Sequence, residues 1–154
     1  LTILRSISAP IVTPHNFTPG AVAYQLGLGE GPATAIQAIN TVAVLAIVLW
    51  AAVRTSPVVG YLTAATASQL LSPVLWDHYA MLLLLPTAWL IERGRWWAAA
   101  IPLSTSIVLI WLPAVVYPIA FWTALLAPIV IGREPDSRLR AQRPEPDPVL
   151  SSEA

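Results

Sequence analysis

Long apolar runs separated by short polar joints dominate the pattern of hydrophobic and polar positions along the chain. The first run is followed by Arg54 and has about the 20 residues that a membrane-spanning helix needs. The last run, residues 96–131, is long enough for two helices, because a helix rises about 1.5 Å per residue and a bilayer core is about 30 Å thick. The pattern therefore predicts an all-α integral membrane protein with about five transmembrane helices. They cover residues 33–53, 57–73, 76–91, 96–112 and 114–131.

The two ends of the chain differ from this apolar region. Residues 1–32 are rich in Pro and Gly and predict an extracytoplasmic loop with one short interfacial helix, over residues 21–28. Residues 132–154 are charged and Pro-rich, which is typical of a disordered segment. The chain starts without Met, and Arg5 breaks the first apolar stretch too early for a signal peptide. We therefore expect the sequence to be the C-terminal part of a longer protein.

Composition narrows the class of protein further. The chain is 56% hydrophobic and only 10% charged, whereas an ordinary soluble domain is about 25% charged. Its net charge is zero and it has no basic face, so a nucleic-acid partner is excluded. It contains no cysteine, which excludes disulfides, thiolate metal sites and cysteine nucleophiles. No phosphate-binding loop or dinucleotide fingerprint occurs, so no nucleotide or other cofactor is predicted.

The arginines predict the orientation in the membrane, because positively charged loops stay in the cytoplasm. Arg54 follows the first predicted helix, Arg93 and Arg95 follow the third, and the tail after the fifth carries four more. With one crossing per helix, all of these lie on one side, which should be the cytoplasm. The opposite side receives residues 1–32, residues 72–78 and the turn near Pro113.

The joint between the second and third helices holds one acid and one base, Asp77 and His78. Placing a charge inside lipid costs roughly 2.5–3.5 kcal/mol on insertion scales, so the pair should lie at a water boundary. Trp76 and Tyr79 flank it, and aromatic rings prefer that depth. Two interpretations stay open: Asp77 caps the third helix, or the pair is an acid–base or anion-binding site. A zinc site is not expected, because His15 is the only other histidine.

The loop over residues 13–25 also has two interpretations. It is either a Pro- and Gly-bounded connection that leads into the interfacial helix, or a polar site on the same outer face as Asp77 and His78. In the second case His15, Asn16, Tyr24 and Gln25 line that site, since amide and aromatic groups are suited to holding sugars. Polar residues within the helices, such as Asn40, are interpreted mainly as helix-packing contacts.

The stretch LLSPVLWDHYAMLLLLP, residues 70–86, resembles the "SPxxWxHH" joint of the polytopic membrane glycosyltransferases of family 87. The earlier HNFTPG is similar to the "NxS" loop motif of that family, with Asn16 kept and Thr18 in the place of Ser. The order and spacing of the two motifs fit, and so do the ERGRWW turn, the two further helices and the Arg-rich tail. The residues of the joint that match are Ser72, Pro73, Trp76, Asp77 and His78, and Tyr79 stands where the family has a second His.

The resemblance implies the C-terminal part of a GT-C type helical bundle in a bacterial plasma membrane. Such enzymes transfer a sugar, typically mannose, from a polyprenyl-phosphate carrier to a lipid or glycan acceptor on the outer face. Their general base is an aspartate in an outer loop near the N-terminus, for which this chain has no counterpart. On this pattern His78, held by Asp77, binds the donor phosphate or assists its departure, without a metal ion. The residues expected to contact substrate are Asn16, Gln25, Trp76 and Tyr79.

Two other classes of protein remain open. A transporter or flippase would use Asp77 and His78 as a proton relay, although proton paths usually need several ionisable residues within the membrane. A non-catalytic assembly subunit would use Asp77 only to cap a helix.

Overall fold

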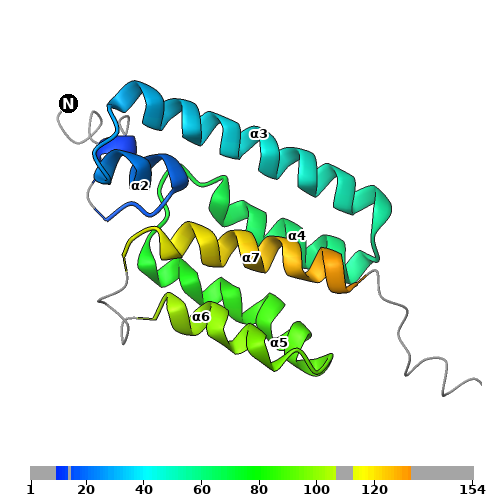
Figure 1. The fold of residues 1–154 in the computed structure, drawn as a ribbon. Coiled ribbons are helices and arrows are strands. Elements are labelled where there is room, and N and C mark those ends of the chain that lie inside the picture. The colour runs from blue at the N-terminus through cyan, green and yellow to red at the C-terminus, as the bar shows by residue number, and fades with distance from the viewer. Residues whose placement is uncertain (1–9, 14, 107–112, 133–154) are drawn as a thin grey trace, which may run out of the picture.

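The computed structural model describes residues 10–13, 15–106 and 113–132 of the chain, and throughout these ranges the chain forms helices and their connections, with no strand. The predicted all-helical fold is therefore confirmed for this part of the chain (Figure 1). The helices, with 3₁₀ segments marked η, are η1 (Pro10–Val12), α2 (Pro19–Gln25), α3 (Glu30–Arg54), α4 (Pro57–Leu70), η2 (Asp77–Leu83), α5 (Leu84–Glu92), η3 (Trp96–Ala99), α6 (Ala100–Ser104) and α7 (Val116–Ile131).

Two helices, α2 and α4, begin at a Ser/Thr-Pro pair. Pro57 occupies the first turn of α4, where its missing N–H costs nothing. Ser56 precedes it as N-cap, and its hydroxyl accepts a hydrogen bond from the backbone N–H of Val59 at 3.4 Å. In α2, Pro19 takes the same place after Thr18. The first residues of these two helices are therefore marked in the sequence.

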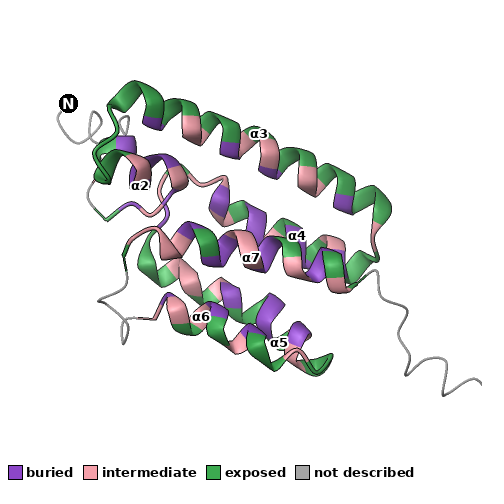
Figure 2. Ribbon diagram, in the orientation of Figure 1, coloured by how far each residue is buried: buried purple, intermediate pink, exposed green. Residues whose placement is uncertain are grey.

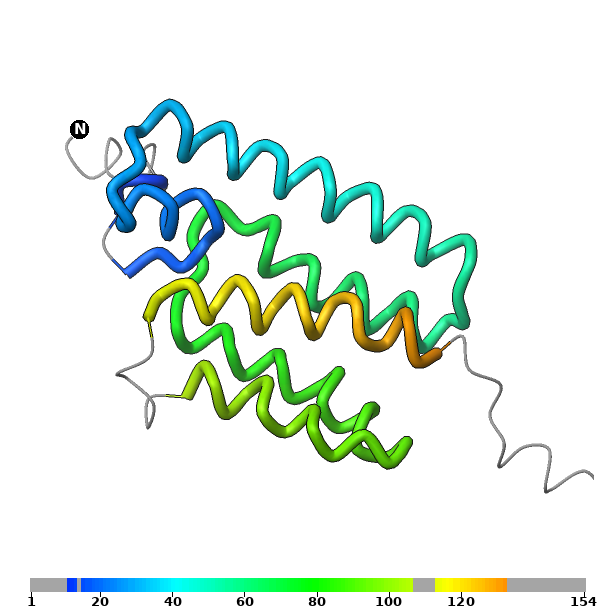
Figure 3. The backbone as a smooth tube through the Cα atoms, viewed as in Figure 1, coloured from blue at the N-terminus to red at the C-terminus, as the bar shows by residue number. Residues whose placement is uncertain are grey.

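The helices run alternately in opposite directions, as Figure 3 shows along the backbone. Helix α3 packs against α2 and α4, whereas α7 packs against α4, α5 and α6. Phe121 and Leu125 of α7 are fully buried, together with Leu70, Leu83 and Leu90 from the elements around it. Helix α7 therefore forms the centre of the bundle's core.

This alternation gives the bundle two chemically different ends. Helices α3, α5 and α7 all end at one end of the bundle, and α4 begins at that same end (Figure 1). A side chain added at Gly132, just after α7, would meet Val59 of α4 at 2.7 Å and Trp89 of α5 at 3.6 Å, which places these three segments together. Arg54 closes α3 and Arg93 follows α5, so this is the arginine end. The opposite end holds the loop before α2, the joint after α4 and the start of α7.

One described helix, α3, is long and apolar enough to cross a membrane by length and composition. Only 17% of its most apolar 18-residue stretch is buried, unlike the central helix of a soluble protein. Figure 2 shows exposed residues recurring along its whole length. Helix α7 is apolar but, at 16 residues, shorter than a typical span. The structure thus gives one candidate span, and five crossings stay a prediction.

Several expected boundaries differ from the observed ones. Helix α4 ends at Leu70, before the expected end at residue 73, because residues 71–76 form an irregular joint. The third run begins as the 3₁₀ helix η2 and becomes α-helical only at Leu84. The interfacial helix covers Pro19–Gln25 instead of residues 21–28. The turn expected near residues 112–114 falls partly, and the tail after residue 132 entirely, outside the described residues, as do residues 1–9.

Candidate functional site

The structure brings the two sequence motifs together at one end of the bundle. The backbone N–H of Phe17, in the loop before α2, donates a hydrogen bond of 2.9 Å to the carbonyl of Leu75, in the joint after α4. This contact joins segments that lie almost sixty residues apart in the sequence. The two motifs therefore lie at the same end of the bundle, and a shared polar site on the outer face of a membrane stays a prediction.

Asn16 makes most of this connection. Its side chain is completely buried. Its Oδ1 accepts hydrogen bonds from the backbone N–H groups of Thr18 and Leu75, both at 3.0 Å. Its Nδ2 donates to the carbonyl of Pro73 at 3.2 Å. The amide that the sequence suggested for a sugar contact is thus used to hold the chain's own backbone.

Gln25 and His15 belong to the same loop region. The Nε2 of Gln25 donates a hydrogen bond of 2.8 Å to the carbonyl of Asn16, so this amide also braces the loop. His15 is exposed and has a left-handed backbone conformation, with φ of 58°. Tyr24 is partly exposed on α2. Contacts from these residues to a ligand stay a prediction.

Asp77 and His78 lie at the start of η2 and are open to the surroundings. Their side chains are 63% and 64% exposed, and the distance between Asp77 Oδ1 and His78 Nδ1 is 3.6 Å, which is too long for a direct hydrogen bond. The backbone N–H of His78 donates to Asp77 Oδ1 at 2.9 Å. Asp77 is therefore the first residue of the helix and binds the N–H that follows it, while Trp76 is the N-cap and provides no capping side chain.

Aromatic rings surround this pair. The His78 ring lies 4.5 Å from the Tyr79 ring and 6.3 Å from the Trp76 ring, centroid to centroid. Tyr79 packs partly against the core, whereas Trp76 is 41% exposed. The four consecutive residues thus offer one carboxylate, one imidazole and two aromatic faces at the surface of this end.

Phe17 and Tyr117 are residues of this end that the sequence did not single out. Their rings stack with centroids 4.1 Å apart and an interplanar angle of 12°. The Tyr117 hydroxyl donates to the carbonyl of Thr105 at 3.1 Å, and the Asp77 carboxylate lies within electrostatic range of the same phenol. The sequence signal for this pair is weak: Tyr117 lies near the start of the helix expected over residues 114–131, on the side of the membrane where Phe17 was also expected.

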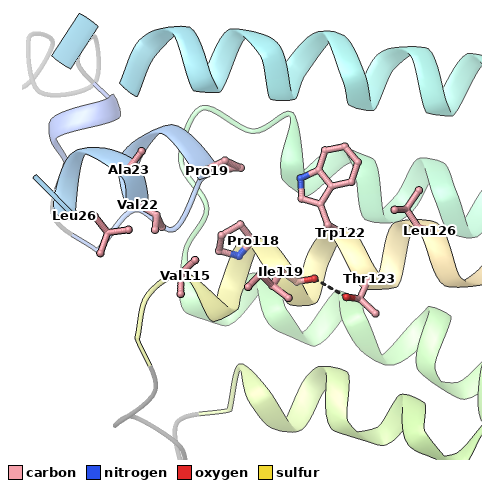
Figure 4. Close-up of a pocket in the computed structure, with 10 residues that line it drawn as sticks. All are labelled: Pro19, Val22, Ala23, Leu26, Val115, Pro118, Ile119, Trp122, Thr123 and Leu126. Atoms are coloured by element: carbon pink, nitrogen blue, oxygen red, sulfur yellow. Dashed lines mark hydrogen bonds between the residues drawn. The ribbon is translucent and has the colours of Figure 1, made fainter. Parts of the chain in front are cut away.

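An apolar groove of about 490 Å³ lies between α2 and α7, at the same end of the bundle (Figure 4). Two of its side chains have polar groups, and both are bonded within the protein. The Thr123 hydroxyl donates to the carbonyl of Ile119 at 2.8 Å, and Trp122 Nε1 donates to Asn40 Oδ1 at 3.0 Å. The groove therefore offers hydrocarbon surface and no free polar group from its side chains. The lining residues are Pro19, Val22, Ala23, Leu26, Val115, Pro118, Ile119, Trp122, Thr123 and Leu126.

Within the described residues, no three His, Asp or Glu side chains come close enough together to hold a metal ion. Comparisons of the chain with family models, with characterised proteins and with solved structures found no match. What this end of the bundle can do must therefore be inferred from its own groups. An imidazole can bind an anion when it is protonated, and an exposed aromatic face can stack on a sugar ring.

Proposed function

We propose that the chain is part of a polytopic membrane glycosyltransferase. It transfers a sugar, typically mannose, from a polyprenyl-phosphate carrier to a lipid or glycan acceptor on the outer face of a bacterial plasma membrane. The observation that carries the proposal is the meeting of the Asn16 loop and the Trp76–Asp77–His78 joint at one end of the bundle. These are the two segments that resemble motifs of glycosyltransferase family 87.

Crossing of the membrane by the whole bundle is supported by the apolar character of its exposed surface. Large apolar side chains are exposed on α3, α4, η2, α5 and α7. The continuous helix formed by η2 and α5 is about 27 Å long, because a 3₁₀ helix rises about 2.0 Å per residue and an α-helix about 1.5 Å. A bilayer core of about 30 Å can adjust to this length by local thinning. Elements shorter than a typical span can therefore still cross.

The orientation follows from the two ends of the bundle. The arginine end carries Arg54, Arg93 and Arg95, and we place it in the cytoplasm. Trp96 and Trp97, next in sequence, are 73% and 50% exposed and suit the aromatic belt at that interface. The end with Asp77 and His78 then faces outward, and the tail after α7 lies in the cytoplasm.

Sugar transfer from a phosphodiester has two chemical requirements: the acceptor hydroxyl must lose a proton, and the departing phosphate must be stabilised. A protonated imidazole at position 78 meets the second requirement, since a positioned donor beside a developing anion is worth a few kcal/mol in the transition state. The Asp77 carboxylate lies 3.6 Å from His78 Nδ1, so its negative charge stands beside that ring. The exposed face of Trp76 offers a surface for the sugar ring. On the family's pattern, the base for the acceptor belongs to a segment outside this chain.

The test is sugar transfer in membranes from cells that express the protein, with labelled polyprenyl-phosphate mannose as donor. His78→Ala should reduce transfer by about 100-fold or more, which corresponds to the loss of one strong donor in the transition state. Asp77→Asn, which removes the negative charge beside His78, should also lower transfer. Glu92→Gln is its matched control, because it also turns an exposed carboxylate into an amide, but at the arginine end. Equal transfer by wild type and His78→Ala, at matched protein level, contradicts the proposal.

A purely structural role for Asp77 is the second candidate, favoured by its hydrogen bond with the His78 N–H. Asp77→Ser separates the two, because a serine hydroxyl can still accept a backbone N–H at a helix start but has no charge. Full transfer by Asp77→Ser together with loss in His78→Ala leaves Asp77 as a helix-start residue and His78 as the functional one. Full transfer by both variants removes the pair from the active site.

A further inference from the structure

The joint between α4 and η2 has backbone groups that no helix satisfies. The last carbonyls of a helix have no partner within it, and in a water-poor environment each needs one from elsewhere. Helix α4 finishes at Leu70, whose carbonyl accepts a hydrogen bond from the side-chain amide of Asn40 at 3.1 Å. Further along the joint, the backbone groups of Pro73 and Leu75 are bound by Asn16 and by the N–H of Phe17.

Asn16 is the side chain that bridges most of these groups. It contacts three backbone groups at once, one in its own loop and two in the joint, which are 57 and 59 residues away in sequence. It is fully buried, so these bonds are shielded from competition by water. Leu75, which it holds, is also fully buried, and only Trp76 separates Leu75 from Asp77.

We infer that Asn16 is a positioning residue. It clamps the joint against the loop before α2 and thereby fixes where Asp77 and His78 emerge from the bundle. Asn16 does not itself contact substrate. The clamp is inferred from the geometry alone, whereas its effect on catalysis rests on the glycosyltransferase function proposed above.

The local turn and the bridge can be separated by mutation. The bond from Asn16 Oδ1 to the Thr18 N–H forms a turn within the loop, and a serine hydroxyl can make the same turn more weakly. The shorter Ser side chain cannot also reach Leu75 and Pro73. Asn16→Ser therefore keeps the loop's own bond and removes the bridge. Asn16→Asp is not a conservative control, because it places a carboxylate oxygen opposite the Pro73 carbonyl, which Asn16 Nδ2 binds as a donor.

The distance between two spin labels in the whole protein measures how tightly the joint is held relative to α3. The chain has no native cysteine, so Ile39→Cys on α3 and Met81→Cys on η2 provide unique attachment points. Both native side chains are exposed, at 68% and 72%. The distance distribution should be narrow in the protein with Asn16. It should broaden in Asn16→Ser and Asn16→Ala. An unchanged distribution in both of the latter overturns the inference.

The kinetics of transfer distinguish positioning from substrate contact. A misplaced catalytic group lowers kcat, by on the order of 100-fold for a displacement near 1 Å, and leaves KM for the donor within about twofold. A raised KM with an unchanged label distance shows that Asn16 binds substrate and overturns the inference. Gln69→Ala is the control, since its amide bonds the neighbouring Ser68 near the joint and should alter neither readout.

The label distances and the transfer kinetics together also separate this inference from the proposed function. If the wild-type protein transfers no sugar, the proposed function fails, and the label distances still decide whether Asn16 holds the joint. If Asn16→Ala does not accumulate in the membrane, Asn16→Ser provides the same comparison with the local turn kept. Broadening in Asn16→Ser, against a narrow distribution in the protein with Asn16, is the result that the clamp predicts.

Discussion

Asn40 should contribute measurable stability to the bundle, because it ties three helices together. It lies on α3 and is 5% exposed. Its Nδ2 donates to the carbonyl of Leu70, at the end of α4, at 3.1 Å, and its Oδ1 accepts from Trp122 Nε1, on α7, at 3.0 Å. Asn40→Leu retains a similar side-chain volume but removes both bonds. It leaves the buried Leu70 carbonyl without that donor.

The size of the effect follows from the number of bonds and their surroundings. Hydrogen bonds between helices in a membrane average about 0.6 kcal/mol and reach about 1.7 kcal/mol. A buried polar group left without its partner costs about 1–3 kcal/mol. Asn40→Leu should therefore lower the free energy of unfolding by about 1–3 kcal/mol. Trp122→Phe removes only the second bond and should cost less.

A double-mutant cycle isolates the bond between the two side chains. Wild type, Asn40→Leu, Trp122→Phe and the double variant are unfolded reversibly in mixed micelles, and helix content is followed by circular dichroism. We expect a coupling free energy of about 0.6–1.7 kcal/mol between the two sites. Independent sites add within about 0.5 kcal/mol, so a coupling below that value means that the tie between α3 and α7 is not formed.

Two further predictions concern close packing and a helix start. Gly20→Ala should destabilise the protein by about 1–3 kcal/mol. An added Cβ at this residue of α2 would lie only 2.7 Å from both the carbonyl oxygen of Ala33 and the Cβ of Gln37 on α3. An unchanged unfolding midpoint in the same assay would show that α2 does not pack closely on α3 there. Ser56→Ala should lower the free energy of unfolding by about 1 kcal/mol, because the Val59 N–H loses its capping oxygen. Ser56→Asp should retain the stability of the wild type. An equal loss of stability in both variants would contradict the capping role of Ser56.

The helices could be predicted from the sequence because their signals are local. The apolar run of α3 ends at Arg54, and Ser56 with Pro57 marks the start of α4, so both positions agree with the structure. The 3₁₀ form of η2 could not be anticipated. Its residues, Asp77–Leu83, contain no Gly or Pro that would disfavour an α-helix. The observed form has no local signal in these side chains, and we have no physical account of it.

The candidate site was predictable in part. Counting arginines placed the Asn16 loop and the Asp77–His78 joint on the same side, and the structure brings them into contact. The burial of Asn16 could not be deduced, because its partners lie 57 and 59 residues away and depend on how α3 and α4 pack. The stacking of Phe17 on Tyr117 could not be deduced either, because these two residues are also far apart in the sequence and meet only through helix packing. Local sequence identifies polar candidates, and packing decides which of them face solvent.

The proposed enzyme requires the Asp77–His78 end to face outward and the arginine end to face the cytoplasm. The most direct measurement is labelling of single cysteines with a membrane-impermeant thiol reagent on intact cells. Leu28→Cys reports on the outer end, between α2 and α3, and Glu92→Cys on the arginine end; Gly94 is avoided because its φ of 77° would strain a cysteine. We expect Leu28→Cys to react on intact cells and Glu92→Cys only after permeabilisation. Reaction of Glu92→Cys from outside would contradict the proposed orientation.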